Sequence, residues 1–296
     1  MKKIKVVTHN GDFHSDDVFA VAILQVVFGK DNIEVLRTRD ESFFDSADIL
    51  LDLGGIYDEE KNRFDHHQSG GAGQRENGIP YASAGLVWKK FGEQVCGSKE
   101  IALSVDEKLF LPIDANDNGV NIYGSTFGDF LPYTIQDLVN IFRATWKEEK
   151  SLNDERFIDV VSWAQKIIER EVLLAKHYKE AEALVEQDYQ RAEDKRLIIL
   201  NGKYPWSKVL MNHPEPLFVV YQDGVNDFWR VKAVGEDKQV FKNRKDFPAS
   251  WAGKRDAQLA EITKVPDSLF CHNKLFLAVA KSKEGALALA KIALEN

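Results

Sequence analysis

The chain has 296 residues, of which 44% are hydrophobic and 29% are charged. These proportions are typical of a globular protein, and the length suits two domains of ordinary size. The absence of any run of about 18 apolar residues argues against a transmembrane helix, and a net charge of −8 argues against a protein that coats long nucleic acid.

Residues 1–150 are predicted to form an α/β domain built on a parallel sheet. The stretch IKVVT is β-branched and apolar, as a buried parallel strand should be. Strand, helix and strand in this order indicate a parallel βαβ unit. The expected strands are 4–8, 33–38 and 47–55, and the expected helices run from Ser15 or Asp16 to Gly29, over 82–92 and over 98–111.

The rest of the chain is predicted to contain a helical connector, 151–195, and a smaller C-terminal α/β domain, 196–296. In the connector, Phe157, Val160, Val161 and Ala164 recur at helical spacing with charges between them. The C-terminal domain has the strand-like stretches LIIL, PLFVVYQ and FWRVKAV and ends with the helix-like KEGALALAKIAL. The fold class is therefore α/β throughout.

The net charge differs between the two predicted parts of the chain. Residues 1–196 hold 24 Lys/Arg against 36 Asp/Glu, net −12, and residues 197–296 hold 15 against 11, net +4. An acidic domain can hold divalent cations, and a basic domain can hold an anionic substrate.

Cys96 and Cys271 lie outside any CxxC spacing, and the apolar run after the first lysines is too short for a secretory signal. We therefore expect free thiols and a cytoplasmic protein.

Histidine and aspartate gather in four clusters, three of them just after predicted strands. Ligands of open parallel sheets bind beyond the carboxyl ends of the strands, so these clusters should converge. Asp and His without Cys favour Mn²⁺, with Mg²⁺ or Co²⁺ as alternatives. Several carboxylates suggest two ions, because one aspartate can bridge them. The clusters are His9, Asp12, His14, Asp16 and Asp17; Asp52; Asp65, His66 and His67; and Asp114 and Asp117.

Each cluster alone has an ordinary structural explanation. Asp12, Asp16 and Asp17 could cap a helix or lie in solvent, and Asp52 could be a turn residue. The DNG sequence around Asp117 favours a β-turn by itself. Two adjacent histidines beside an aspartate are harder to explain without a ligand. Four clusters at topologically equivalent places favour a shared metal site.

The spellings HNGDFHSDD, DLGG, RFDHHQ, ASAGLVWKKFG and IDANDNG resemble the Myg-type (melanocyte-proliferating-gene) family of metal-dependent hydrolases and exonucleases, related to the DHH phosphoesterase superfamily. The similarity continues through FWRVKAV, PASWAGKRDAQLAEI, LFCH and KEGALALA, so it covers most of the chain. It implies a DHH-type catalytic domain with two divalent ions, most simply Mn²⁺, and a second domain that holds substrate.

The resemblance also implies a role for individual residues. DHH enzymes open with HxxxDxD, whereas this chain has His9, His14 and Asp16, one residue longer and with His at the middle position. Asp52 matches the bridging aspartate and His66 the metal-binding histidine. His67, beside Asp65, matches the catalytic histidine that contacts phosphate or the leaving group. Asp114 matches the last metal aspartate better than Asp117; Asp12 and Asp117 are kept as substitutes or supports.

Substrate binding is expected to involve the C-terminal domain and the cleft between the domains. Guanidinium groups bind phosphate oxygens in a bidentate way. The glycine-rich loop 69–78 lacks the P-loop ending and is interpreted as a lid, with Arg75 as a phosphate contact. The candidates in the second domain are Arg230, Arg244, Arg255 and His272.

The leading functional hypothesis is a two-metal phosphodiesterase, an exonuclease acting on RNA or short oligonucleotides. A phosphatase for a small molecule such as a nucleotide or pyrophosphate is the alternative enzyme. A metal-binding structural or regulatory protein is the third hypothesis, although structural metal sites are usually closed and cysteine-rich. A homodimer is left open.

Overall fold

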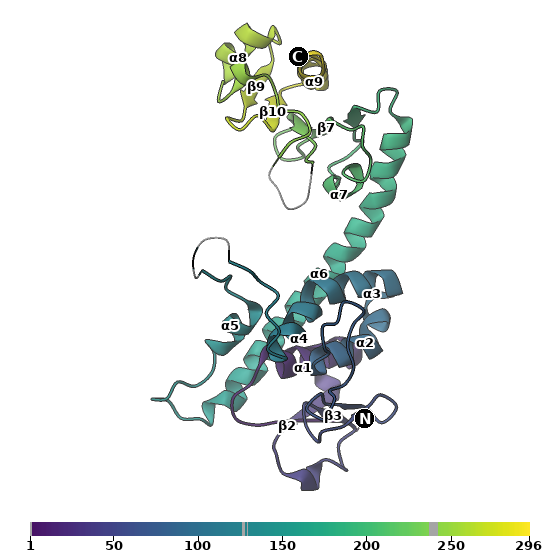
Figure 1. Cartoon of the computed structure of the whole chain (residues 1–296), viewed down its shortest axis with the longest axis vertical. Coiled ribbons are helices and arrows are strands. Elements are labelled where there is room, and N and C mark those ends of the chain that lie inside the picture. Colours follow the sequence, from purple (N-terminus) through teal and green to yellow (C-terminus); the bar gives the residue numbers. More distant parts are fainter. Residues whose placement is uncertain (1, 126–127, 129, 237–241) are drawn as a thin grey trace. The chain divides into compact units, whose positions relative to one another are not determined.

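The computed structural model describes residues 2–125, 128, 130–236 and 242–296 (Figure 1). The chain divides into two compact units, Met1–Lys176 and His177–Asn296. One helix, α6 (Leu152–Arg191), has residues in both units. The expected boundaries after residues 150 and 195 remain predictions. Among the residues described, no helix combines the length and apolarity that crossing a membrane requires.

The first unit contains a five-stranded sheet with the order β2-β1-β3-β5-β4. Strands β2, β1, β3 and β5 pair in parallel, and β4 is antiparallel to β5. The parallel sheet predicted from sequence is thus confirmed: the strand 4–8 has the expected bounds, the other two expected strands are shorter than predicted, and two further strands, β4 and β5, are present. The strands are β1 (Ile4–Thr8), β2 (Ile33–Arg37), β3 (Ile49–Leu51), β4 (Tyr57–Asp58) and β5 (Arg63–Phe64).

Helices of the first unit pack together beside this sheet, as Figure 1 shows. Helix α1 is buried from Ser15 to Gln25 and packs along α2, so its sequence is apolar on every side. The expected helix 98–111 is longer than predicted and contains a π-helical turn, η3 (Asp106–Phe110). The helices are α1 (Ser15–Phe28), α2 (Ser83–Cys96), α3 (Lys99–Val105), α4 (Leu111–Asp117) and α5 (Ile135–Asn140), with 3-10 turns η1 (Lys30–Asn32) and η2 (Glu41–Phe43).

The core of the first unit joins the sheet, these helices and the first half of α6. Phe157, Val161 and Ala164 of α6 are fully buried in the same apolar cluster as Val6 of β1. Phe13, in the loop after β1, packs edge-on against Phe157. The long helix α6 therefore packs against the loop that follows β1. This loop carries the first of the histidine and aspartate clusters.

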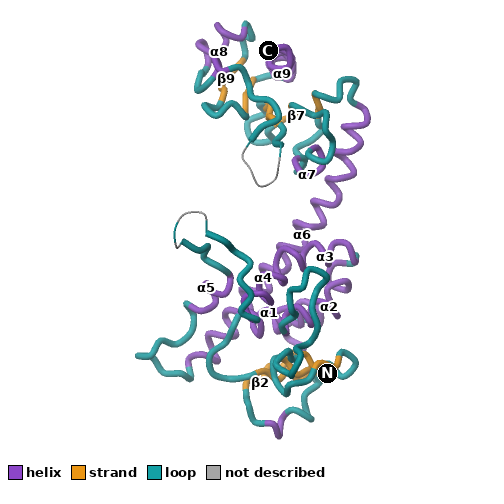
Figure 2. The backbone as a smooth tube through the Cα atoms, in the orientation of Figure 1, coloured by secondary structure: helices purple, strands orange, loops and turns teal. Residues whose placement is uncertain are grey.

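The second unit is built on another five-stranded sheet, with the order β6-β7-β8-β10-β9 (strands in orange in Figure 2). Only β6 and β7 of this sheet pair in parallel. The free cysteines expected from sequence are confirmed, and both are buried. The elements are β6 (Leu197–Ile199), α7 (Ser207–Leu210), β7 (Phe218–Gln222), β8 (Trp229–Ala233), η4 (Ala249–Trp251), α8 (Asp256–Thr263), β9 (Ser268–Cys271), β10 (Leu277–Ala280) and α9 (Lys283–Glu295).

Candidate metal centre

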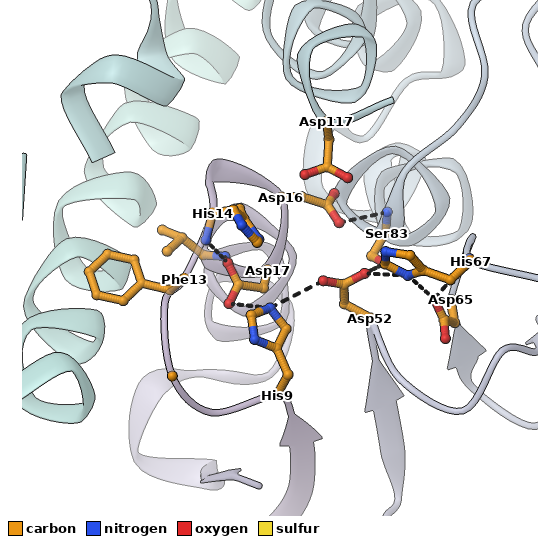
Figure 3. A network of polar contacts seen from close by, with 12 residues as sticks. His9, Phe13, His14, Asp16, Asp17, Asp52, Asp65, His67, Ser83 and Asp117 are labelled. Atoms are coloured by element: carbon orange, nitrogen blue, oxygen red, sulfur yellow. Dashed lines mark hydrogen bonds and ion pairs between the residues drawn. The ribbon is translucent and has the colours of Figure 1, made fainter. Parts of the chain in front are cut away.

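Histidine and aspartate side chains from five places in the first unit point toward one another (Figure 3). His9, Asp52 and Asp65 each come directly after a parallel strand, namely β1, β3 and β5. The first turn of α1 contributes two further aspartates, and the last residue of α4 is Asp117. The carboxyl ends of neighbouring parallel strands meet at one edge of the sheet, which explains the convergence.

One group is formed by His9, His14 and Asp17, whose ligand atoms lie within 4.8 Å of one another. His9 Nε2 is 3.2 Å from Asp17 Oδ2. The other oxygen of Asp17 accepts from the backbone N–H of His14 at 2.7 Å and of Val18 at 2.9 Å. His14 is the N-cap of α1, so the expectation that Ser15 or Asp16 caps this helix was wrong. The capping contacts fix Asp17 in the direction of His9.

A second group is formed by Asp16, His66 and Asp117, with ligand atoms again within 4.8 Å. His66 Nε2 is 3.1 Å from Asp117 Oδ2. Asp16 is fully buried, and its carboxylate accepts from the backbone N–H groups of Ser83 (3.0 Å) and Ala84 at the start of α2. The positive end of the α2 dipole favours a carboxylate there. Helix α2 therefore holds Asp16 in place.

Asp52 lies between the two groups. Its Oδ2 is 3.2 Å from His9 Nε2, and its Oδ1 is 3.5 Å from His66 Nε2. The backbone of Asp52 has a φ of 53°, in the left-handed region that aspartate tolerates better than most residues. This turn at the end of β3 directs the carboxylate into the cluster. One carboxylate thus faces both groups, with Oδ2 toward His9 and Oδ1 toward His66 and His67, whose Nδ1 is 3.4 Å away. Asp52, His66 and His67 themselves form a third set of ligand atoms within 4.8 Å of one another.

Asp65 organises the two adjacent histidines. Its Oδ1 accepts from the backbone N–H of His66 (2.7 Å) and of His67 (3.1 Å) and lies 2.8 Å from His67 Nδ1. Its Oδ2 accepts from the backbone N–H of Gly55 at 2.6 Å. The His66 side chain is buried, whereas that of His67 is 61% exposed. Asp65 is therefore occupied by protein donors, and it orients His67 with Nδ1 inward.

The charges of these groups fit divalent cations. Four carboxylates, those of Asp16, Asp17, Asp52 and Asp117, converge where little solvent reaches them. Burial raises the pKa of Asp17 to about 7. Burial alone would lower the pKa of His66, but the carboxylates of Asp117 and Asp52 raise it to about 11. In the absence of a metal, protons thus compensate part of the negative charge.

Unsatisfied atoms point to the same conclusion. His9 Nε2, Asp17 Oδ2 and His66 Nε2 are buried, and they make ion-pair contacts of 3.1–3.2 Å but no hydrogen bond among the described residues. Buried polar atoms are nearly always hydrogen-bonded, so buried ligand atoms held together without a hydrogen bond point to a further partner. A cation bound by imidazole nitrogen and carboxylate oxygen would satisfy them, and such mixed N/O donors suit Mn²⁺. The residues present therefore fit divalent metal ions.

Three residues expected at or near the centre have other partners. Asp114 is fully buried and ion-paired with Arg75, whose Nη1 is 2.7 Å from Asp114 Oδ2. Arg75 also binds Asp106, so the expectation that it contacts phosphate was wrong. Asp12 is exposed, and its Oδ1 accepts from Asn153 at 3.1 Å. The structure therefore brings Asp117 to the metal groups, and it places Asp114 and Asp12 outside them.

Two arginines near the centre were not anticipated from sequence. Arg39 lines the cavity of about 510 Å³ that contains His9, Asp52 and His67, and within the described ranges it has no hydrogen-bond or ion-pair partner. Arg143 donates through Nε to the carbonyl of Phe13, and its Nη2 is buried without a partner among the described residues. Each is a single arginine outside any motif, so only the fold identifies them.

The candidates of the second unit have separate environments. Arg244 donates to the backbone carbonyls of Met211, His213 and Pro216, and its role as a substrate contact remains a prediction. Arg230 Nη2 is 2.6 Å from Asp223 Oδ2. Both Arg255 and His272 contact the ring of Phe270. Arg230, Arg255 and His272 remain predictions as substrate contacts.

Comparison with known proteins identifies the family. A family model described as "Uncharacterised protein family (UPF0160)", MYG1_exonuc, matches residues 5–294. The chain belongs to the Myg family. The MYG1 protein of Caenorhabditis elegans is 30% identical over 320 residues, covering 97% of this chain and 94% of that protein. The MYG1 exonuclease of Homo sapiens is 29% identical over 324 residues, covering 98% of this Myg-family chain and 85% of the human protein. The resemblance to the Myg family inferred from the motifs is thereby confirmed.

Proposed function

We propose that this Myg-family chain is a two-metal phosphodiesterase that acts as an exonuclease on RNA or short oligonucleotides. The observation that carries the proposal is the position of Asp52, whose Oδ2 faces His9 and whose Oδ1 faces the adjacent His66 and His67. A carboxylate with one oxygen toward each of two ligand groups is the arrangement that a pair of bridged metal ions requires. The printed name of the human and mouse relatives, MYG1 exonuclease, supports the same reaction class.

The ligands divide naturally between two ions. His9, His14 and Asp17 would hold the first ion; Asp16, His66 and Asp117 would hold the second; and Asp52 would be shared. When bound there, two such ions would supply an activated water molecule and would neutralise the developing charge of the phosphoryl group and the leaving oxygen. The same division of ligands supports a relation to the DHH phosphoesterase superfamily.

The protein's own side chains supply the remaining chemistry. His67 is exposed to the cavity, and its Nδ1–H can donate to Asp65, so in the protonated imidazolium form its Nε2–H can donate a proton or a hydrogen bond to the leaving oxygen. Arg39 lines the same cavity and can bind a phosphate oxygen of the substrate. Within the second unit, Arg230 and Arg255 are the proposed phosphate-binding residues. These roles explain why the cavity combines carboxylates, imidazoles and one arginine.

A small-molecule phosphatase is the second candidate. The metal-centre cavity, at about 510 Å³, has the size of an ordinary small-molecule site. A cavity of this volume does not require a polymeric substrate. A purely structural metal site is a weaker candidate, because structural sites are closed and cysteine-rich, whereas this one adjoins an open cavity lined by a solvent-exposed histidine.

The test is a side-by-side assay of the protein purified with Mn²⁺. The substrates are an end-labelled RNA oligonucleotide, bis-p-nitrophenyl phosphate and pyrophosphate, and bound metal is counted by mass spectrometry. Two Mn²⁺ per chain and stepwise shortening of the RNA are expected. Turnover of pyrophosphate alone would favour the phosphatase, and fewer than two ions would overturn the two-metal mechanism.

A further inference from the structure

A second cavity adjoins the metal centre in the first unit. It has a volume of about 500 Å³, and Asn116 lines both this cavity and the one that contains His9, Asp52 and His67. Asn116 directly precedes Asp117 in α4. Two aromatic rings, Tyr123 and Tyr133, line the second cavity together with the aliphatic and proline side chains of Pro112, Val120, Ile122, Leu131 and Pro132. The two cavities are therefore neighbours on either side of one asparagine.

We propose that this second cavity, the tyrosine pocket, binds the nucleobase next to the phosphate that is hydrolysed. The proposal rests on the function proposed above, because it assumes that the phosphate lies at the metal centre. It adds what that function does not specify: a subsite for a planar heterocycle within the first unit, and thus a preference for nucleotides over other phosphate esters.

The lining chemistry suits a base. Tyr123 is 41% exposed and Tyr133 is 67% exposed, so their rings are not buried in the core and are open to a ligand. Stacking of a base on an aromatic side chain contributes about 1–3 kcal/mol and tolerates any base. The cavity volume of about 500 Å³ is within the range of ordinary ligand sites. A flat, aromatic guest fits this lining better than a sugar or an inorganic anion does.

Asn116 supplies a polar contact for the base edge. Its side-chain amide has no hydrogen-bond partner in the part of the chain that the structure describes. An amide offers both a donor and an acceptor, which base edges also do. Other polar residues of the lining are already engaged: Asp137 Oδ2 accepts from the N–H and the hydroxyl of Thr134, both at 2.7 Å. Asn116 is thus available where the base would meet the metal centre.

The wall of the tyrosine pocket is tied to the metal centre. Gln136 of α5 lines the metal-centre cavity, and its Oε1 accepts from the backbone N–H of Ser15 at 2.8 Å and from its hydroxyl at 2.6 Å. Ser15 lies between His14 and Asp16, both in the metal groups. Helix α5 follows directly after Tyr133 and Thr134. These bonds fix the distance between the pocket and the metals, as a subsite for a neighbouring base requires.

Binding of small probes tests the pocket without any turnover. Adenosine 5′-monophosphate and ribose 5-phosphate carry the same phosphate, and only the first has a base. Calorimetry on the full chain with Mn²⁺ should show about 5- to 150-fold tighter binding of the nucleotide, as expected from about 1–3 kcal/mol of stacking. In Tyr123→Ala and Tyr133→Ala this ratio should fall toward one, while the affinity for ribose 5-phosphate stays unchanged.

Tyr178→Ala is the matched control, because Tyr178 is 43% exposed and lies in α6, outside the pocket lining. Its ratio should equal that of the parent. Asn116→Ala should lower the ratio by a smaller factor. Thermal unfolding of each variant verifies that it is folded. An equal affinity of the parent for the two probes, or an undiminished ratio in both pocket variants, overturns the proposal.

A cleavage experiment separates this proposal from the nuclease function. RNA trinucleotides are compared with versions that carry an abasic ribose on one or the other side of the scissile phosphate. In Tyr123→Ala, kcat/KM for the intact RNA should fall about tenfold or more below the parent value. For the substrate that lacks the base bound in the pocket, parent and variant should have equal kcat/KM, because there is no base to stack on Tyr123. An equal penalty on all three substrates overturns the pocket. No cleavage of RNA by the parent overturns the nuclease instead, and the binding ratio still decides the pocket.

Discussion

Arg75 Nη1 lies 2.7 Å from Asp114 Oδ2, deep in the first unit. The same guanidinium holds Asp106 through Nε and Nη2 at 2.8 and 2.7 Å. Asp114 also accepts from the backbone N–H of Gly85 at 3.0 Å. One arginine thus ties the glycine-rich loop to the π-helical turn and to α4. Only three residues further along α4, Asp117 faces His66, so two aspartates on one helix have different partners.

Neutralising Asp117 should change metal binding, whereas neutralising Asp114 should change stability. Asp117→Asn should reduce the bound Mn²⁺ from two ions per chain to one, because a ligand of the second group is lost. Asp114→Asn should keep both ions but lower the free energy of unfolding by about 1–3 kcal/mol, because Arg75 loses a buried partner. Metal analysis after dialysis and urea unfolding measure the two quantities. Loss of metal from a folded Asp114→Asn would reverse the assignment.

Gly85→Ala should also destabilise the first unit. A Cβ on Gly85 would lie 1.8 Å from Asp114 Oδ2 and 2.8 Å from Arg75 Nη2, so the ion pair would have to shift. Overpacking of this kind costs about 1–3 kcal/mol. Gly124→Ala is the control, because no atom of the described residues lies within 4 Å of its Cβ, and it should change stability by less than about 0.5 kcal/mol. Equal unfolding midpoints for both variants would show that the residues around Asp114 rearrange to accommodate the added methyl group without loss of stability.

The sequence predicts much of the framework of this site, for identifiable reasons. Val6, Val7 and Thr8 are buried on both faces of the sheet, so β1 appears as a continuous apolar run with His9 at its end. By contrast, β5 has two residues, too few for any periodicity. The choice between Asp114 and Asp117 depends on Arg75, which is far away in sequence. Arg39 carries no local pattern at all, and only tertiary structure places it in the cavity.

Asp52→Asn should weaken both metal sites together. Asparagine tolerates the left-handed backbone of this position, so the variant tests the charge without straining the turn. The neutral amide cannot serve two cations as a carboxylate does. Metal titration should show both ions bound at least about tenfold more weakly. Asp12→Asn, in an exposed ion pair with Lys150, is the control and should bind as the parent does. Retention of one tight ion in Asp52→Asn would contradict a shared ligand.

Metal removal should lower the thermal stability of the first unit. Without cations, the four carboxylates repel one another in a buried place, and bound Mn²⁺ stabilises the native state by about 2.7 kcal/mol at a hundredfold excess over Kd. Scanning calorimetry with EDTA and then with added Mn²⁺ should show a Tm that falls and recovers. The same cycle on Asp52→Asn should give a smaller shift. An identical shift in both proteins would mean that Mn²⁺ acts elsewhere on the chain.

His67→Ala should separate turnover from metal binding. The buried ring of His66 lies 3.1 Å from Asp117, whereas the His67 ring is held by Asp65 and is exposed to the cavity. His67→Ala should therefore keep near-normal Mn²⁺ content and lose roughly 10²-fold or more in kcat, the contribution of a positioned acid–base group. His66→Ala should lose metal and activity together. If His67→Ala released an ion while His66→Ala retained both, the two histidines would have exchanged roles, and the leaving oxygen would take its proton from another group.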